Sequence, residues 1–108
     1  MLLNLTDCKR LSEIKIISLR SKNMTKCFNL LSKCTNLTAA YLQNNQIIFK
    51  DLNYLGEMKN LVKLNLSYNN LTILPNANVF QGLANLKIFF LDHNKISKWR
   101  DIESLTVI

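Results

Sequence analysis

The sequence predicts an α/β fold: a right-handed superhelix with a parallel sheet on its concave side and short helical or 3₁₀ arcs on its convex side. The first observation behind this prediction is composition, because Leu (20 residues) and Asn (15 residues) make up about a third of the 108 residues. Ordinary domains are not led by this pair, so both residues are expected to hold fixed places in a repeated unit. The second is a hydrophobic pattern that returns every 23 to 25 residues, and the third is an Asn at the same place in three of its copies.

The repeated unit follows the template L-x-x-L-x-L-x-x-N-x-L. It begins at Ile14, Leu37, Leu61 and Leu86, and these starts are separated by 23, 24 and 25 residues. Tandem copies with a period of about 20 to 29 residues are typical of leucine-rich repeats, which stack into a solenoid. The chain is therefore expected to form a single leucine-rich-repeat domain over residues 1–108. Its expected parts are a degenerate cap over 1–13 and repeats over 14–36, 37–60, 61–85 and 86–108.

Each repeat is expected to contribute one short strand whose alternate residues point into the core. In the third repeat, Leu64 and Leu66 are expected to point inward, whereas Lys63, Asn65 and Ser67 face the concave surface. The ninth template position lies where the chain leaves the strand. An Asn amide there both donates hydrogen bonds to neighbouring turns and accepts them. It is expected to pair backbone groups that would otherwise cost about 1 to 3 kcal/mol each when buried.

The two ends of the solenoid differ from its middle. The ninth position of the first repeat is Lys22, whose ammonium group only donates hydrogen bonds, so the Asn ladder is expected to be broken or exposed there. At the other end the chain stops near the place where a fifth strand would begin, without a recognisable cap. Because an uncapped solenoid exposes its core, this end is expected to continue in a longer protein or to be covered by a partner chain.

The segments that join the strands space their apolar residues by three or four, which predicts helical or 3₁₀ arcs. A short helix is expected within residues 25–34, and a shorter helical or 3₁₀ arc within 51–58. In the longer arc over 74–83, Pro75 prevents an early helix, and Phe80 is expected to fill the core.

Charge and cysteine content restrict the partners and the compartment. Fourteen Lys and Arg against seven Asp and Glu give a net charge of +7, and residues 1–36 hold seven of the basic residues. A basic balance suits nucleic acid, an anionic membrane or an acidic protein, and it is also common on an ordinary solvated surface. Cys8, Cys27 and Cys34 are odd in number and lack metal-ligand spacing, so free thiols are expected. The absence of a signal-peptide pattern and of a long apolar run favours an intracellular protein without a membrane span.

The chain offers little chemistry for catalysis or metal binding. It has one His and no pair of carboxylates at a convincing spacing, whereas catalysis needs acid, base or nucleophilic groups that converge. His93 follows Asp92, but neighbouring residues at the end of a strand are expected to point in different directions, which argues against a dyad. Two Gly residues are too few for a phosphate-binding loop. No enzymatic activity, cofactor, metal site or small-molecule substrate is therefore expected.

The concave surface of the sheet is the remaining candidate site. Tyr41 and Phe90 are expected to face solvent among polar side chains, and aromatic residues within a polar rim are typical of protein-binding hot spots. The alternative is that a flanking element covers them, or that the surface has no partner. The candidate partner-binding residues are Tyr41, Asn65, Phe90, Lys63, Ile88, Arg20, Gln43, Tyr68, Asp92 and His93.

Three parts of the chain carry a more specific resemblance: residues 33–37, residues 66–76, and residues 80–88 together with 91–94. They resemble the leucine-rich repeat and IQ domain-containing proteins, within the intracellular repeat proteins that lack flanking Cys clusters. The resemblance implies an interaction scaffold in a ciliary, flagellar, axonemal or other cytoskeletal assembly. No I-Q-x-x-x-R motif occurs in the chain, so calmodulin binding is not implied.

Two functions follow from these observations. The first is a non-catalytic protein-interaction scaffold that binds partners on the concave face and at the C-terminal end. The alternative is an RNA-associated adaptor, similar to a spliceosomal leucine-rich-repeat protein, that relies on the basic N-terminal third and uses Lys15, Arg20, Lys22 and Lys63. The two differ in salt dependence, because a nucleic-acid interface loses affinity steeply as the salt concentration rises.

Overall fold

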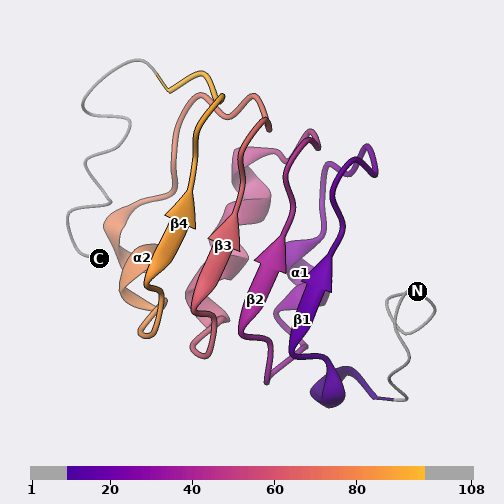
Figure 1. Ribbon diagram of the computed structural model, residues 1–108. Coiled ribbons are helices and arrows are strands. Elements are labelled where there is room, and N and C mark those ends of the chain that lie inside the picture. Colours follow the sequence, from indigo (N-terminus) through magenta and orange to yellow (C-terminus); the bar gives the residue numbers. More distant parts are fainter. Residues whose placement is uncertain (1–9, 97–108) are drawn as a thin grey trace.

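A computed structural model describes residues 10–96 of the chain. Its centre is one parallel sheet whose four strands lie in the order β1-β2-β3-β4 (Figure 1). Each strand therefore lies beside the strands that precede and follow it in the sequence, as in other stacked repeats. The strands are β1 (Ile16–Ser18), β2 (Ala39–Tyr41), β3 (Lys63–Asn65) and β4 (Ile88–Phe90).

The register of the sheet pairs residues that hold the same template position. At the third position, Ile16 pairs with Ala39, Ala39 with Lys63, and Lys63 with Ile88. Since side chains alternate along a strand, the fourth position points to the opposite face and packs in the core. Its residues are Ile17, Ala40 and Leu64, which are buried, and Phe89, which is partly buried.

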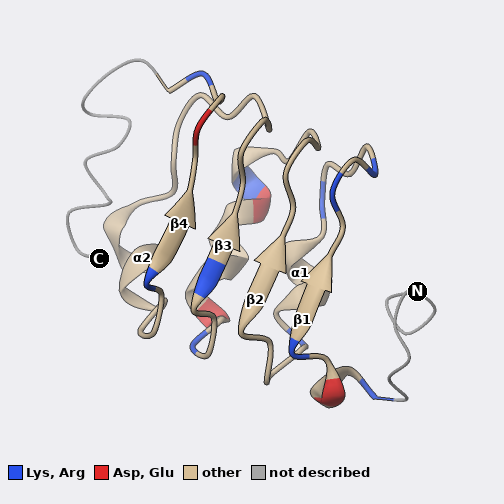
Figure 2. Ribbon diagram, in the orientation of Figure 1, with Lys and Arg blue, Asp and Glu red and all other residues tan. Residues whose placement is uncertain are grey.

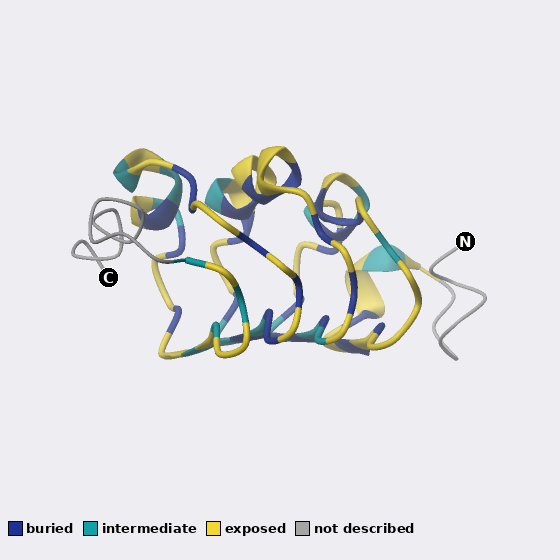
Figure 3. Ribbon diagram, turned by 90° about the horizontal axis from the view of Figure 1, so that it is seen from above, coloured by how far each residue is buried: buried dark blue, intermediate teal, exposed yellow. Residues whose placement is uncertain are grey.

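The helices of the connecting segments pack on one face of this sheet, and the core lies between the two layers (Figure 3). The helices are α1 (Phe28–Leu31), the 3₁₀ helix η3 (Phe49–Glu57) and α2 (Ala77–Gln81), and a short 3₁₀ helix, η2 (Leu11–Glu13), precedes the sheet. We refer to the face of the sheet that no helix covers as the open face. The predicted α/β fold with a parallel sheet and short helical or 3₁₀ arcs is confirmed.

The helices lie where helical spacing predicts them, but their relative lengths differ from the prediction. α1 lies within residues 25–34, and α2 begins two residues after Pro75. The arc expected to be shorter, η3, is a 3₁₀ helix of nine residues, the longest helix in the described part. Its 3₁₀ geometry suits the sequence, because Leu52 and Leu55, three residues apart, both lie on the buried side of a helix with three residues per turn.

The Asn residues at the ninth template position form a ladder through the core. The Asn69 side chain accepts a hydrogen bond from the Ile47 amide (3.1 Å) and donates one to the Leu42 carbonyl (3.0 Å), so it joins two repeats. Asn45 bonds to the first repeat and Asn94 to the third in the same way. The predicted role of these residues is confirmed.

A second Asn ladder, which the template did not predict, lies at the opposite ends of the strands. Each of its members directly precedes the first template position of a repeat. The sequence therefore contains the signal for this ladder, one residue before the template begins. The side-chain amides donate to backbone carbonyls 24 to 26 residues earlier in the chain: Asn36 to Ser12 in the cap (2.8 Å), Asn60 to Thr35 in the first repeat (2.8 Å) and Asn85 to Lys59 in the second repeat (2.7 Å).

A buried carboxylate connects η3 to α1. Oδ2 of Asp51 accepts hydrogen bonds from the amides of Cys27 (2.8 Å) and Phe28 (3.0 Å), which are the unpaired donors at the start of α1. The Cys27 thiol lies next to this carboxylate. Burial, together with the negative charge of Asp51, raises the pKa of Cys27 to about 12, so the thiol stays protonated and unreactive at neutral pH.

This raised pKa predicts a loss of stability in alkaline solution. The thiol of the unfolded chain ionises near its ordinary pKa of 9.0, and the folded thiol only near 12, so the unfolded state binds fewer protons between these values. The contribution is fully present below pH 9 and is lost as the pH rises toward 12. Between pH 8 and 10 the free energy of unfolding of the wild type should fall by about 1.4 kcal/mol more than that of Cys27→Ala. Urea titrations of both proteins test this, and equal pH dependence would contradict it.

The two edges of the sheet differ in how well they are covered. Lys22, which follows β1, is exposed, and the part of the chain described before it, residues 10–21, contains no Asn, as the broken ladder predicted. At β4, Leu91 and Ile96 are partly buried, whereas their equivalents in the third repeat are fully or almost fully buried. The predicted cap over 1–13 is described only from residue 10 onward, and the prediction about the C-terminal end concerns residues outside the described range. Within residues 10–96, no helix has the length and apolar character needed to cross a bilayer.

Candidate functional site

The strands of the open face carry five of the ten candidate partner-binding residues, namely Tyr41, Lys63, Asn65, Ile88 and Phe90. Its rows run across the four strands: one row has Ile16, Ala39, Lys63 and Ile88, and the next has Ser18, Tyr41, Asn65 and Phe90. Ile16 has 64% of its surface exposed, and Ile88 and Phe90 each have 42% exposed. Tyr41 is only half-buried. The face therefore presents large apolar and aromatic groups to solvent at several strands, which is unusual for scattered surface residues.

Lys63 lies between two aromatic rings at the middle of this face. Its Nζ is 5.2 Å from the centre of the Tyr41 ring and 5.7 Å from the centre of the Phe90 ring. Both distances are within the range of a cation–π interaction. Tyr41 comes from β2 and Phe90 from β4, so the long side chain of Lys63 on β3 has an aromatic ring on either side.

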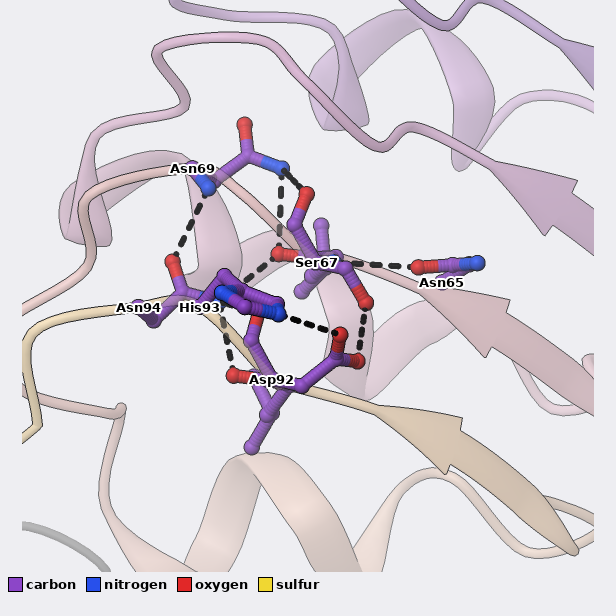
Figure 4. A network of polar contacts seen from close by, with 8 residues as sticks. Asn65, Ser67, Asn69, Asp92, His93 and Asn94 are labelled. Carbon is purple, nitrogen blue, oxygen red and sulfur yellow. Dashed lines mark hydrogen bonds and ion pairs between the residues drawn. The ribbon is translucent and has the colours of Figure 1, made fainter.

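A polar network occupies the end of the open face where β3 and β4 lead into turns (Figure 4). The Ser67 hydroxyl donates a hydrogen bond of 2.5 Å to Oδ1 of Asp92, and this bond lowers the pKa of that carboxyl group. His93 Nε2 lies 3.8 Å from Oδ2 of Asp92. The rings of Tyr68 and His93 stack with centres 4.1 Å apart and planes 9° apart.

The geometry of this network depends on left-handed turns at the eighth template position. Ser21, Asn44, Tyr68 and His93 all have φ between 56° and 59°, a conformation that non-Gly residues adopt rarely. Their side chains therefore meet across repeats, and the Asn44 amide donates to the Ser21 hydroxyl at 2.9 Å. The template did not reveal these turns, although polar residues dominate the position.

The expectation that Asp92 and His93 point in different directions is wrong. The left-handed turn at His93 brings its imidazole to 3.8 Å from the carboxylate, within ion-pair range but longer than a hydrogen bond. The arrangement nevertheless does not suit nucleophilic catalysis, because the Ser67 hydroxyl donates to the carboxylate rather than to the imidazole. No cluster of potential metal ligands occurs among residues 10–96.

Three residues of the expected surface lie deeper than their template positions suggest. Ser67 is only 6% exposed, and its hydroxyl donates to Asp92. Ala39 is buried, since its small side chain does not reach beyond its neighbours. Gln43 is half-buried, and its buried Oε1 has no hydrogen-bond partner within residues 10–96. Asn65 lies in β3 and is half-buried, whereas Arg20 follows β1 and is exposed.

A family model described as leucine rich repeat matches residues 35–96, which is more than half of the chain. The chain belongs to the leucine-rich repeat family. Leucine-rich repeats are interaction domains, and this one has the parallel sheet, the short arcs and the Asn ladder that its template requires.

Longer proteins contain a similar leucine-rich repeat region. Leucine-rich repeat and IQ domain-containing protein 3 of Mus musculus is 33% identical over 96 residues, which is 89% of this chain and 14% of that protein. The proteins of the same name from Homo sapiens (33% over 89 residues, 82% of this chain) and Rattus norvegicus (31% over 96 residues, 89% of this chain) are also similar. The chain spans only 13% to 14% of the length of these three relatives.

Proposed function

We propose that this leucine-rich repeat domain is a non-catalytic scaffold that binds a protein partner on the open face of its sheet. The observation that carries the proposal is the cluster of Tyr41, Lys63 and Phe90. It combines exposed aromatic surface with a positively charged group that the rings already hold in place. Aromatic residues in such surroundings supply most of the binding energy in many protein interfaces. A preordered lysine also loses less side-chain entropy when a partner binds.

The further parts of this proposal rest on the family resemblance. We infer that the open face is the concave surface of a right-handed superhelix, and that a second protein contact forms at the β4 edge. The half-buried apolar residues at this edge support the second inference: Phe89, Leu91 and Ile96. The resemblance to leucine-rich repeat and IQ domain-containing proteins further suggests a ciliary, flagellar or cytoskeletal assembly inside the cell.

The alternative, an RNA-associated adaptor, has less support from the arrangement of its cations. Lys15, Arg20 and Lys22 are exposed at the two ends of β1, at the edge of the sheet. Lys63 is two strands away, between Tyr41 and Phe90. The predicted set therefore does not form one continuous basic groove along the open face.

The proposal predicts that the double variant Tyr41→Ala, Phe90→Ala loses partner binding. The partner is first identified by cross-linking to the wild-type chain in an extract of the source cells, and its affinity is then measured by calorimetry. Truncation of two hot-spot aromatic residues should weaken binding by about 2 kcal/mol or more, which is roughly thirtyfold.

The matched control is the double variant Phe49→Ala, Tyr54→Ala. It removes the same two residue types from η3, on the helical side of the sheet, where they are 40% and 38% exposed. This control should bind the partner as the wild type does. An open-face variant that binds within about 0.5 kcal/mol of the wild type would show that the open face is not the binding site.

A further inference from the structure

We propose that the partner segment bound by the open face is acidic, and that Lys63 recognises one of its carboxylates. This inference rests on the proposed function, because it names the chemistry of the partner for the same face. The observations that carry it are the contacts of Lys63, the charges around the face and the apolar residues beside Lys63.

Lys63 is a partly buried cation whose ammonium group lies against aromatic rings and not against a carboxylate. The Tyr41 and Phe90 rings lie within 5.2 and 5.7 Å of its Nζ, and no ion pair involves Lys63 within residues 10–96. A ring face attracts a cation, but it does not pair with the three N–H donors of an ammonium group as a carboxylate does. Because Lys63 has already lost part of its hydration, its pairing with a carboxylate costs less further desolvation.

The charges on and beside the open face favour a negative partner. Its one described carboxylate, Asp92, is engaged by the Ser67 hydroxyl at 2.5 Å and lies 3.8 Å from His93 Nε2. The remaining charged residues within two positions of the strands are cations (Figure 2), and complementary charge increases both association rate and specificity. They are Lys63 in β3, Arg20 after β1, and Lys15 and Lys87 directly before β1 and β4, where the last two lie at the end of the sheet beside Asn36, Asn60 and Asn85. The other described carboxylates lie on the 3₁₀ helices: Glu13 on η2, and Asp51 and Glu57 on η3.

Apolar residues beside Lys63 indicate that the partner segment also carries apolar side chains. Ile88 pairs with Lys63 in the register and is 42% exposed, and Phe90 lies on the same strand with equal exposure. Ile16 is the most exposed of these groups, on the far strand of the same row. A carboxylate above Lys63 would therefore have large apolar side chains of its own segment on either side, packed on Ile16, Ile88 and Phe90. This mixture of acidic and apolar side chains is found in protein segments and not in nucleic acids.

The test uses two fluorescein-labelled peptides of about twelve residues. At about 3.3 Å per residue they are long enough to cross four strands that lie about 4.8 Å apart. One peptide contains Glu, Leu and Ser in equal numbers, and the other has Gln in place of every Glu. Fluorescence anisotropy with the complete 108-residue chain should show at least tenfold tighter binding of the Glu peptide. Equal binding of the two peptides, or no binding of the Glu peptide, would overturn the proposal.

Three variants assign the recognition to Lys63. Lys63→Met keeps the length of the side chain and should weaken binding of the Glu peptide about tenfold, whereas Lys63→Arg should retain most of it. The control is Lys50→Met, which removes an exposed lysine from η3 on the other side of the sheet and should have no effect. If Lys63→Met binds as Lys50→Met does, Lys63 does not recognise the carboxylate.

Calorimetry with the native partner separates this inference from the proposed function. If Tyr41→Ala, Phe90→Ala abolishes binding of the native partner while Lys63→Met does not, the open face is the binding site and only the role of Lys63 is wrong. If neither variant affects the partner, both proposals are wrong. A single-stranded oligouridylate of similar length is the third probe. If it binds more tightly than the Glu peptide, with an affinity that falls steeply as the salt concentration rises, the proposal of an acidic protein segment is wrong and the open face binds RNA.

Discussion

Asn69→Ala is expected to lower the free energy of unfolding by about 3 to 4 kcal/mol. The Asn69 amide makes four hydrogen bonds to backbone groups in the core, and its side chain is almost fully buried. In the variant, the buried amide of Ile47 loses its hydrogen-bond acceptor, which by itself costs about 1 to 3 kcal/mol. Three carbonyl contacts and the packing volume of the amide group are lost in addition.

The carbonyls would suffer less than the Ile47 amide, because each keeps a second donor. Leu42 O also accepts from the Asn45 side chain, Leu66 O from the Asn94 side chain, and Ser67 O from the Asn44 backbone amide. This is why the expected loss is well below four times the cost of one unpaired group.

The control for this prediction is Asn53→Ala in η3, where the side chain is exposed. It should change the free energy of unfolding by no more than about 0.5 kcal/mol. Urea unfolding followed by circular dichroism measures both variants. If Asn69→Ala were as stable as Asn53→Ala, the ladder would not contribute to the stability of the fold.

Gly82→Ala is expected to destabilise the protein by about 3 kcal/mol. The two glycines of the chain meet where α2 packs against η3, and a Cβ atom added at Gly82 would lie 2.1 Å from the Gly56 carbonyl oxygen. It would also lie 2.7 Å from the Gly56 carbonyl carbon and Cα. These are backbone atoms that cannot rotate away, so α2 and η3 would have to move apart and disturb the core between them.

The opposite substitution, Gly56→Ala, is the matched control. A Cβ atom there would meet the Val79 carbonyl oxygen at 3.4 Å, close to an ordinary van der Waals distance. Its effect should stay within about 1 kcal/mol. Gly82 has φ −71° and ψ −18°, a region where Ala is intrinsically favoured over Gly, so any loss at this position is steric. Thermal unfolding of both variants tests this prediction. Similar melting temperatures would show that the backbones at Gly56 and Gly82 do not approach as closely as described.

The repeat template predicted the parts of the fold that depend on one repeat at a time. Alternation along each strand placed Leu64 inward and Lys63 outward, and the register confirms this assignment. The ninth position was correctly interpreted as a polar residue that bonds to neighbouring turns. In both cases the residue type has a single physical role, which recurs with the period of the sequence.

The candidate site was predicted less completely, because much of it depends on contacts between repeats. The template located Tyr41, Lys63 and Phe90 on one face, but it did not predict that the Lys63 ammonium group lies near both rings. It also placed Ser67 on the surface, whereas Ser67 is buried and its hydroxyl donates to Asp92 of the next repeat.

The sequence is sufficient to identify leucine-rich repeats, because hydrophobic period and polar turn position are local properties repeated along the chain. Which side chains act together across repeats depends instead on how the repeats pack in the folded protein. The capping of α1 by Asp51, the stacking of Tyr68 on His93 and the contact between Gly56 and Gly82 join residues of adjacent repeats. Their distances depend on how arcs of unequal length pack against one another, and no single repeat contains that information.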